Sequence, residues 1–259
     1  MHQKHEMLYR LHDNRSLDRR EEEALDLISG FLREHPRSYV AFSGGKDSSV
    51  MLHLISRVNK NVAVLTDFND LMWSDAEEHC HKVVDHCGMT NYIPVRTPDS
   101  MQKELQKHLR GEEAIFNIFD GLIQWVADNK PQGLFMGIRA EENKKTRGSV
   151  IKHQGLVHQY AYNDYTATNH LAYKWVCRPM GYWQGPQVFA YIIKYGIPYH
   201  KVYSYNISKL PHEIRFNVAI DAKIAARSFC QDQWQTLRAV DPAFATRLLQ
   251  SIPELRFLK

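Results

Sequence analysis

Long apolar runs and a strong charge of either sign are both missing from this sequence of 259 residues. No segment approaches the roughly 18 consecutive apolar residues that a membrane-spanning helix needs. Residues 1–20 are charged and lack the apolar centre of a signal peptide. We therefore expect a cytoplasmic protein that does not contact a membrane. The 33 basic and 29 acidic side chains leave a formal net charge of +4, which is too small to indicate nucleic-acid binding by itself.

Cysteine is scarce and widely spaced. The four cysteines are Cys80, Cys87, Cys177 and Cys230. Because no two of them form a Cys-x-x-Cys pair, the spacing argues against a zinc ribbon, a thioredoxin-like motif and a ferredoxin cluster. Histidines accompany two of the cysteines within residues 79–87, but side chains of successive residues diverge on a predicted helix. Packing is therefore the better interpretation of this segment, and we assign no metal ligands to it.

Glycine is sparse as well, yet two glycines are adjacent in the segment Ser43-Gly44-Gly45-Lys46-Asp47-Ser48. An apolar, β-favouring run at 39–42 precedes this segment and a helix-periodic run at 50–55 follows it, so the glycines fall on a strand-to-helix turn. Adjacent glycines let the backbone approach a ligand, and the following helix N-terminus offers unpaired N–H groups to a phosphate. The 43–48 loop is therefore predicted to bind a nucleotide through its phosphates.

Other interpretations of the 43–48 loop are weaker. The Gly-x4-Gly-Lys-Ser/Thr spacing of a Walker A motif is absent, and so is a Gly-x-Gly-x-x-Gly dinucleotide fingerprint. A plain glycine turn would be the better interpretation of an isolated Gly-Gly pair. The complete set of six residues between a strand and a helix favours phosphate binding over such a turn.

The order of predicted elements indicates an α/β fold with a mainly parallel, twisted sheet and helices on both of its faces. Predicted strands at 39–42, 62–66, 91–95 and 133–138 alternate with predicted helices at 47–58, 74–87, 99–109 and 113–128. Ligands of such sheets bind beyond the carboxyl ends of the strands. Because the 43–48 loop, Asp67 and Arg139 each follow a predicted strand, we expect them to face one crevice.

Three parts are predicted along the chain. Residues 1–37 form a helical N-terminal extension, residues 38–205 a nucleotide-binding α/β domain, and residues 206–259 a C-terminal helical extension whose last helix starts at Asp241 and stops near Pro253. Residues 145–174 have weak periodicity and are interpreted as a loop or short hairpin that covers the site. The terminal helices offer surfaces for a protein partner or a second copy of the chain.

The 43–48 loop resembles the signature of the PP-loop ATP pyrophosphatases, which split ATP between the α and β phosphates. Other segments are similar to the branch of phosphoadenosine-phosphosulfate (PAPS) reductases and the sulfate adenylyltransferase small subunit. These are the strand ending at Asp67, the block 137–142 with Arg147 downstream, and the Trp/Pro-rich segment 175–203. The likeness spans residues 38–205 and implies an adenine nucleotide α-hydrolase-like fold. Gln187 stands where members of the family usually have an acidic residue. Any role that this acidic residue has in the family is therefore in question for this chain.

The resemblance implies ATP and Mg²⁺ as cofactors, and it implies roles for the loop residues. The backbone of Gly44 and Gly45 and the side chains of Ser43, Lys46 and Ser48 would hold the β- and γ-phosphates. Asp47 would orient the loop or help to position Mg²⁺, although an acid near a helix start is also a common cap.

Residues outside the loop receive roles by the same resemblance. Asp67 would lie on the adenosine side of the nucleotide, or it is an ordinary turn acid. Gly137 belongs to the nucleotide site, and Arg139 and Arg147 would grip the α-phosphate or an anionic second substrate. Glu141 would join Asp47 at Mg²⁺, or it pairs with nearby basic side chains. Lys46, Asp47 and Arg139 are the candidate catalytic residues.

Four functions stay open. The first, favoured by the intact loop, is adenylyl transfer or ATP pyrophosphatase activity that activates an oxyanion or carbonyl acceptor, in sulfur-related or nucleic-acid-modification metabolism. The second is PAPS reduction, which needs a nucleophilic thiolate; the Glu-Cys-Gly-Leu-His tail of such reductases is absent, and Cys230 falls on a predicted helix. The third is sulfur modification of RNA or DNA, with the nucleic acid as acceptor. The fourth is a nucleotide-dependent partner protein without catalysis.

Overall fold

A computed structural model of the chain describes residues 3–10, 14–115, 119–142, 156–159, 175–205, 212, 214, 216 and 231–257. Within these residues, six strands form one sheet in the order β3-β2-β1-β4-β6-β5. The strands are β1 (Ser38–Ala41), β2 (Ala63–Phe68), β3 (Tyr92–Arg96), β4 (Gly133–Phe135), β5 (Val157–Gln159) and β6 (Trp175–Cys177). All neighbouring pairs are parallel except β5 with β6. The predicted mainly parallel sheet is confirmed.

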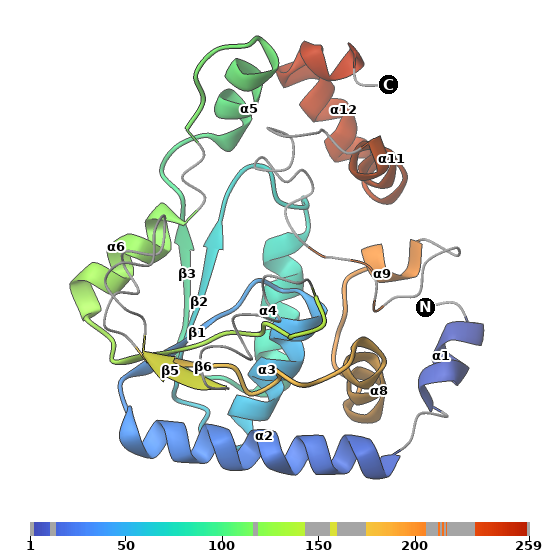
Figure 1. The fold of residues 1–259 in the computed structure, drawn as a ribbon. Coiled ribbons are helices and arrows are strands. Elements are labelled where there is room, and N and C mark those ends of the chain that lie inside the picture. The colour runs from blue at the N-terminus through green and yellow to red at the C-terminus, as the bar shows by residue number, and fades with distance from the viewer. Residues whose placement is uncertain are drawn as a thin grey trace.

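Helices cover both faces of the sheet (Figure 1). They are α1 (Gln3–Arg10), α2 (Asn14–Glu34), α3 (Lys46–Ser56), α4 (Ala76–Cys87), α5 (Met101–Leu109), α6 (Asp120–Asn129), α8 (Gly185–Tyr195), α9 (Val202–Tyr205), α11 (Gln231–Val240) and α12 (Pro242–Ser251), followed by the short 3-10 helix η3 (Pro253–Phe257). None of these described helices has the length and apolarity to cross a membrane.

The core is divided by the sheet into two apolar clusters, because successive residues of a strand point to opposite faces. Val40 and Phe135 belong to the larger cluster, which α2, α3, α4 and α8 cover. Tyr39 and Leu134, each one residue earlier, belong to the smaller cluster, which α6 covers. Because both faces are buried, the strands read as continuous apolar runs, and this is why the sequence revealed them.

Some predicted boundaries are wrong, for identifiable reasons. The helix predicted over 113–128 begins only at Asp120, because the carboxylate of Asp67 accepts a hydrogen bond from the backbone N–H of Leu122 (2.9 Å) and fixes the first turn there. The strand predicted over 133–138 ends at Phe135. Beyond it the chain approaches α3 so closely that a Cβ on Gly137 would lie 3.1 Å from the backbone nitrogen of Ser48.

The segment interpreted as a loop or hairpin, 145–174, contains one short strand. β5 pairs antiparallel with β6, which opens the Trp/Pro-rich segment. Within 145–174 only residues 156–159 are described, so the proposed cover over the site lies outside the described residues.

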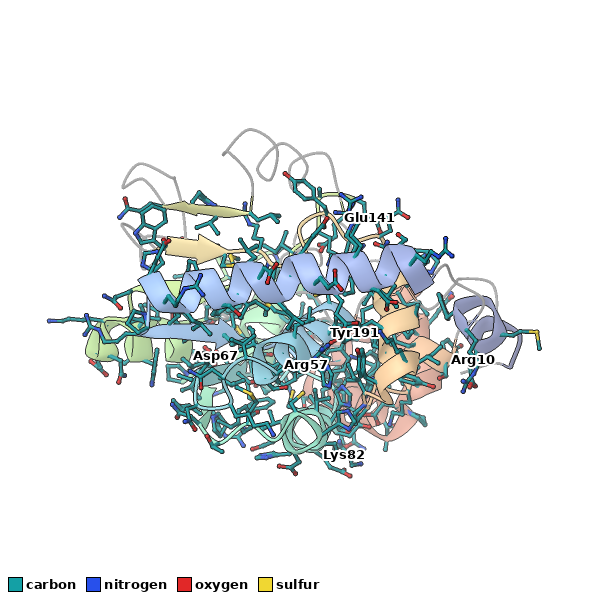
Figure 2. All side chains as sticks on the ribbon, turned by 90° about the horizontal axis from the view of Figure 1, so that it is seen from below. Arg10, Arg57, Asp67, Lys82, Glu141 and Tyr191 are labelled. Atoms are coloured by element: carbon teal, nitrogen blue, oxygen red, sulfur yellow. The ribbon has the colours of Figure 1, made fainter. Side chains whose placement is uncertain are left out.

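The N-terminal helix α2 is fixed to the helices of the sheet by a buried carboxylate. Glu21 accepts hydrogen bonds from the hydroxyl of Tyr195 (2.6 Å), from Nζ of Lys194 (3.0 Å) and from the guanidinium of Arg57. Burial raises the pKa of Glu21, but these hydrogen bonds more than offset it and leave the pKa lowered. Figure 2 shows Arg57 next to Tyr191, whose hydroxyl it also contacts (3.4 Å). α2 is thus held to both α3 and α8.

The C-terminal helices α11 and α12 lie near α5, at the end of the molecule away from α2 (Figure 1). Asp241 caps α12 by accepting a hydrogen bond from the backbone N–H of Phe244 (3.0 Å), and its other oxygen accepts one from the hydroxyl of Ser74. The predicted start of this helix at Asp241 is confirmed. Since Ser74 lies directly before Asp75, the N-cap of α4, the same carboxylate holds the approach to α4. Residues 217–230 of the predicted C-terminal extension lie outside the described residues.

Replacement of Asp241 by Ala should lower the free energy of unfolding by about 1–3 kcal/mol, because the buried side chain both caps a helix and satisfies Ser74. Urea denaturation followed by circular dichroism measures the change. Asp241→Asn keeps an acceptor for the cap and should retain more of the stability. Equal losses in the two variants would contradict a capping role.

Candidate functional site

A cavity of about 560 Å³ lies beyond the carboxyl ends of β1 and β4. Its walls include most of the predicted site residues: Ser43, Gly45, Lys46, Asp47, Ser48, Gly137, Arg139 and Glu141. They meet because β1 and β4 are parallel neighbours, with Val40 opposite Phe135, although these residues are far apart in the sequence. Tyr203, His212 and Phe216 contribute to the same walls from the C-terminal side.

The 43–48 loop depends on glycine at position 44. Gly44 has a φ of 74°, in the left-handed region that other residues rarely adopt. A Cβ there would lie 2.8 Å from Sγ of Cys80 and 2.9 Å from Cε1 of Phe216. Gly45 then acts as the N-cap of α3, so the loop leads directly into the helix N-terminus.

The two serine hydroxyls hold the loop closed on itself. The hydroxyl of Ser48 donates to the carbonyl of Gly45 (3.0 Å), and the hydroxyls of Ser43 and Ser48 lie 3.1 Å apart. Among the described residues, the backbone N–H of Gly45 reaches only the hydroxyl of Ser43, at a long 3.5 Å. This N–H is therefore one of the weakly satisfied donors at the start of α3.

Lys46 is buried, with 5% of its side chain exposed. Its ammonium group lies 3.0 Å from Oδ2 of Asp47 and donates a hydrogen bond to the carbonyl of Ile214 (2.9 Å). Its backbone N–H donates to the hydroxyl of Tyr203 (2.9 Å). Burial raises the pKa of Tyr203, so this hydroxyl stays neutral.

Arg139 is buried, with 4% of the residue exposed, and it joins two carboxylates, of which Glu141 is 40% exposed. Its Nε donates to Oδ1 of Asp47 (2.6 Å), and its Nη1 donates to Oε1 of Glu141. Burial lowers the pKa of Arg139, but the charges of the two carboxylates outweigh burial and leave the pKa raised. Oε1 of Glu141 also accepts a hydrogen bond from the backbone N–H of Gly185 (2.6 Å) at the start of α8. A permanent positive charge thus lies in the cavity wall.

Asp67 is not brought into this arrangement. Asp67 is not among the residues that line the cavity, and Figure 2 shows it well apart from Glu141. Its two oxygens accept hydrogen bonds from the hydroxyl of Thr97 (3.0 Å) and the backbone N–H of Leu122 (2.9 Å), and burial raises its pKa. Its predicted place near adenosine remains a prediction. Arg147 lies outside the described residues.

Asp47 and Glu141 are two of the carboxylates that the cavity offers to a cation, and Glu142 is a third. Among the described residues, no group of three or more His, Cys, Asp or Glu side chains could hold a metal ion. Magnesium usually binds one or two carboxylates together with phosphate oxygens. The two carboxylates therefore fit Mg²⁺ that arrives with a phosphate ligand.

His79 was set aside with the histidine- and cysteine-rich segment, yet it contacts the loop directly. Its Nε2 lies 3.0 Å from the carbonyl oxygen of Gly44, and because a carbonyl only accepts, Nε2 carries the proton. Its neighbour Cys80 and the more distant Cys87 are buried, and burial raises the pKa of both thiols to about 12. No spacing pattern in the sequence links residue 79 to residue 44, so this contact could not be predicted from the sequence.

The family of the chain follows from its sequence as a whole. Residues 37–210, about two thirds of the chain, match the model of the phosphoadenosine phosphosulfate reductase domain. The chain belongs to this family. The family match spans every strand of the sheet and every described residue of the cavity except His212 and Phe216. Among curated proteins, no sequence matches the chain significantly.

Several solved structures are similar to this family member. A PAPS reductase from Candida auris, in a phosphate complex, is 12% identical over 76% of this chain and 94% of that chain, with a TM-score of 0.52. FMN adenylyltransferase from Candida glabrata is 12% identical (80% and 70% covered, TM-score 0.49), and NAD synthetase from Campylobacter jejuni is 15% identical (93% and 95% covered, TM-score 0.42). At 12% identity, the likeness to the reductase shows a common fold alone.

The stability of the protein should fall in acid partly through His79. Burial lowers the pKa of His79 from 6.5 to about 4. Between these values the unfolded chain binds a proton that the folded chain does not, so stability is lost as the pH falls below 6.5. The loss from this residue should reach about 2 kcal/mol at pH 5.

Urea denaturation at pH 7.5, 6 and 5 measures this dependence. His79→Gln has no titrating group at this position and should show a shallower fall than the wild type. A slope unchanged in His79→Gln would contradict the assignment.

Proposed function

We propose that this protein binds ATP with Mg²⁺ and cleaves it between the α and β phosphates, either transferring AMP to an oxyanion or carbonyl acceptor or acting as an ATP pyrophosphatase. The observation that carries the proposal is the complete 43–48 loop, which shares one cavity with the buried guanidinium of Arg139. The acceptor would belong to sulfur-related or nucleic-acid-modification metabolism.

The loop supplies the groups that a terminal pyrophosphate needs. The N-terminus of α3 carries the positive end of the helix dipole, and the N–H of Gly45 is poorly satisfied. The hydroxyls of Ser43 and Ser48 can turn from each other toward phosphate oxygens. Lys46 is held by Asp47 and the carbonyl of Ile214, so a bound phosphate would compete with these two acceptors for its ammonium group.

Arg139 is the group best suited to the α-phosphate. Its guanidinium is fixed by Asp47 and Glu141 before any ligand arrives, and such preorganised charge stabilises a transition state without further rearrangement. Mg²⁺, held by Asp47 and Glu141 together with phosphate oxygens, would neutralise charge on the departing pyrophosphate. In this proposal Arg147 also contacts the α-phosphate, and Asp67 lies on the adenosine side of the nucleotide.

PAPS reduction is the second candidate, favoured by the family to which the chain belongs. That reaction needs a reactive thiolate. The three described cysteines, Cys80, Cys87 and Cys177, are all buried, and burial raises the pKa of each. Within the described residues, this supports ATP cleavage over thiol chemistry.

Pyrophosphate release tests the proposal. The wild type, with ATP, Mg²⁺ and sulfate, other oxyanions or nucleic acid, should release pyrophosphate in a coupled assay. Lys46→Ala and Asp47→Ala should lower the rate by about 100-fold or more, because Lys46 supplies a positive charge to the phosphates and Asp47 holds Arg139 and the proposed Mg²⁺ beside them. Lys103→Ala, an exposed change on α5, is the matched control.

Two results would contradict the proposal. One is the absence of pyrophosphate release with every acceptor. The other is an unchanged rate in Lys46→Ala. Release of sulfite from PAPS with a thiol reductant, in place of pyrophosphate from ATP, would favour the reductase.

A further inference from the structure

The carbonyl of Gly44 is held from behind the loop by α4. Gly44 is the loop residue with the greatest backbone freedom, and its carbonyl accepts the hydrogen bond from Nε2 of His79 at 3.0 Å. The donor comes from a separate element of the fold, and only 7% of His79 is exposed. The contact is therefore shielded from water, which would otherwise compete for the carbonyl.

This hydrogen bond determines where the next amide points. In a trans peptide the C=O of one residue and the N–H of the following residue point in opposite directions. The carbonyl of Gly44 points toward α4, so the N–H of Gly45 points away from α4. Gly45 lines the cavity and Gly44 does not, and within the described part of the chain the N–H of Gly45 has only the long contact to the hydroxyl of Ser43. Holding the carbonyl thus presents this N–H to the cavity.

The ring of His79 is itself held in place by its neighbours. It packs against the rings of His200 (5.4 Å between centroids) and Phe216 (5.4 Å). His200 is oriented in turn, because its Nδ1 accepts from the N–H of Val202 (3.2 Å) and its Nε2 donates to Asp75 (2.8 Å). Asp75 is the N-cap of α4, the helix that carries His79. The hydrogen bond to Asp75 therefore fixes His200 relative to the same helix.

We infer that His79 is a positioning residue for phosphate binding: its hydrogen bond to Gly44 orients the Gly45 N–H toward the phosphate of the ligand. The inference rests on the proposed function in taking the 43–48 loop as the phosphate site. It adds a residue of α4 that touches neither the cavity nor the ligand, and it requires an N–H donor at the position of Nε2 rather than a charge.

The inference is tested with four variants of the full chain. His79→Gln places an amide N–H near the position of Nε2, whereas His79→Asn is too short to reach Gly44. His79→Met matches Gln in length but has no donor. His81→Met, an exposed change on the same helix, is the control. Binding of inorganic pyrophosphate with Mg²⁺, and separately of ATP with Mg²⁺, is measured by isothermal titration calorimetry, and circular dichroism reports folding.

Loss of the hydrogen bond should weaken pyrophosphate binding about tenfold or more in His79→Met and His79→Asn. His79→Gln should stay within about threefold of the wild type, and His81→Met should be unchanged. Wild-type affinity in the Met and Asn variants would overturn the inference. So would an equal loss in Gln, which would show that the ring matters and the donor does not.

The remaining outcomes are also decisive. If one of the Met and Asn variants does not fold, the other decides; if neither folds while Gln does, His79 is structural and the inference fails. Wild-type protein that binds pyrophosphate but not ATP would refute the proposed function and leave the inference to be judged by the pyrophosphate series. Wild-type protein that binds neither would refute both.

Discussion

The buried guanidinium of Arg139 is the group on which the arrangement of the candidate site depends. It joins Asp47, at the start of α3, to Glu141, which also accepts the first N–H of α8. Removal of either carboxylate would leave the buried guanidinium with only one of its two partners. Three segments that are distant in the sequence are therefore held in one geometry by Arg139 and Glu141.

The parallel pairing of β1 with β4 makes this ionic group possible. This pairing brings the end of β4 against the start of α3. The two segments lie so close that position 137 has no room for a side chain, and glycine occupies it. The loop is then held on two sides, by Arg139 through Asp47 at the cavity and by His79 through Gly44 behind it. A loop with two adjacent glycines can adopt many conformations, and fixing it when a ligand binds costs conformational entropy. These contacts restrict the loop before a ligand binds, which lowers that cost.

The sequence was sufficient to predict the central strands and the loop, because strands buried on both faces are continuous apolar runs and the loop is a local motif. It did not reveal β5 and β6, whose three residues each are too few to show a period. The start of α6 and the roles of His79 and Tyr203 were also missed. Each depends on a contact between residues distant in the sequence, Asp67 with Leu122, His79 with Gly44 and Tyr203 with Lys46, and no local pattern encodes such a contact.

The central claim is that the 43–48 loop holds the terminal phosphates of ATP while Arg139 faces the α-phosphate. A crystal structure of the protein with Mg²⁺ and α,β-methylene-ATP, which cannot be cleaved between these phosphates, tests it most directly. The account predicts the β- and γ-phosphates on the N–H of Gly45 and the hydroxyls of Ser43 and Ser48, with the α-phosphate within hydrogen-bonding distance of Arg139. Phosphates bound outside this cavity, or a nucleotide with its base in the loop, would contradict it.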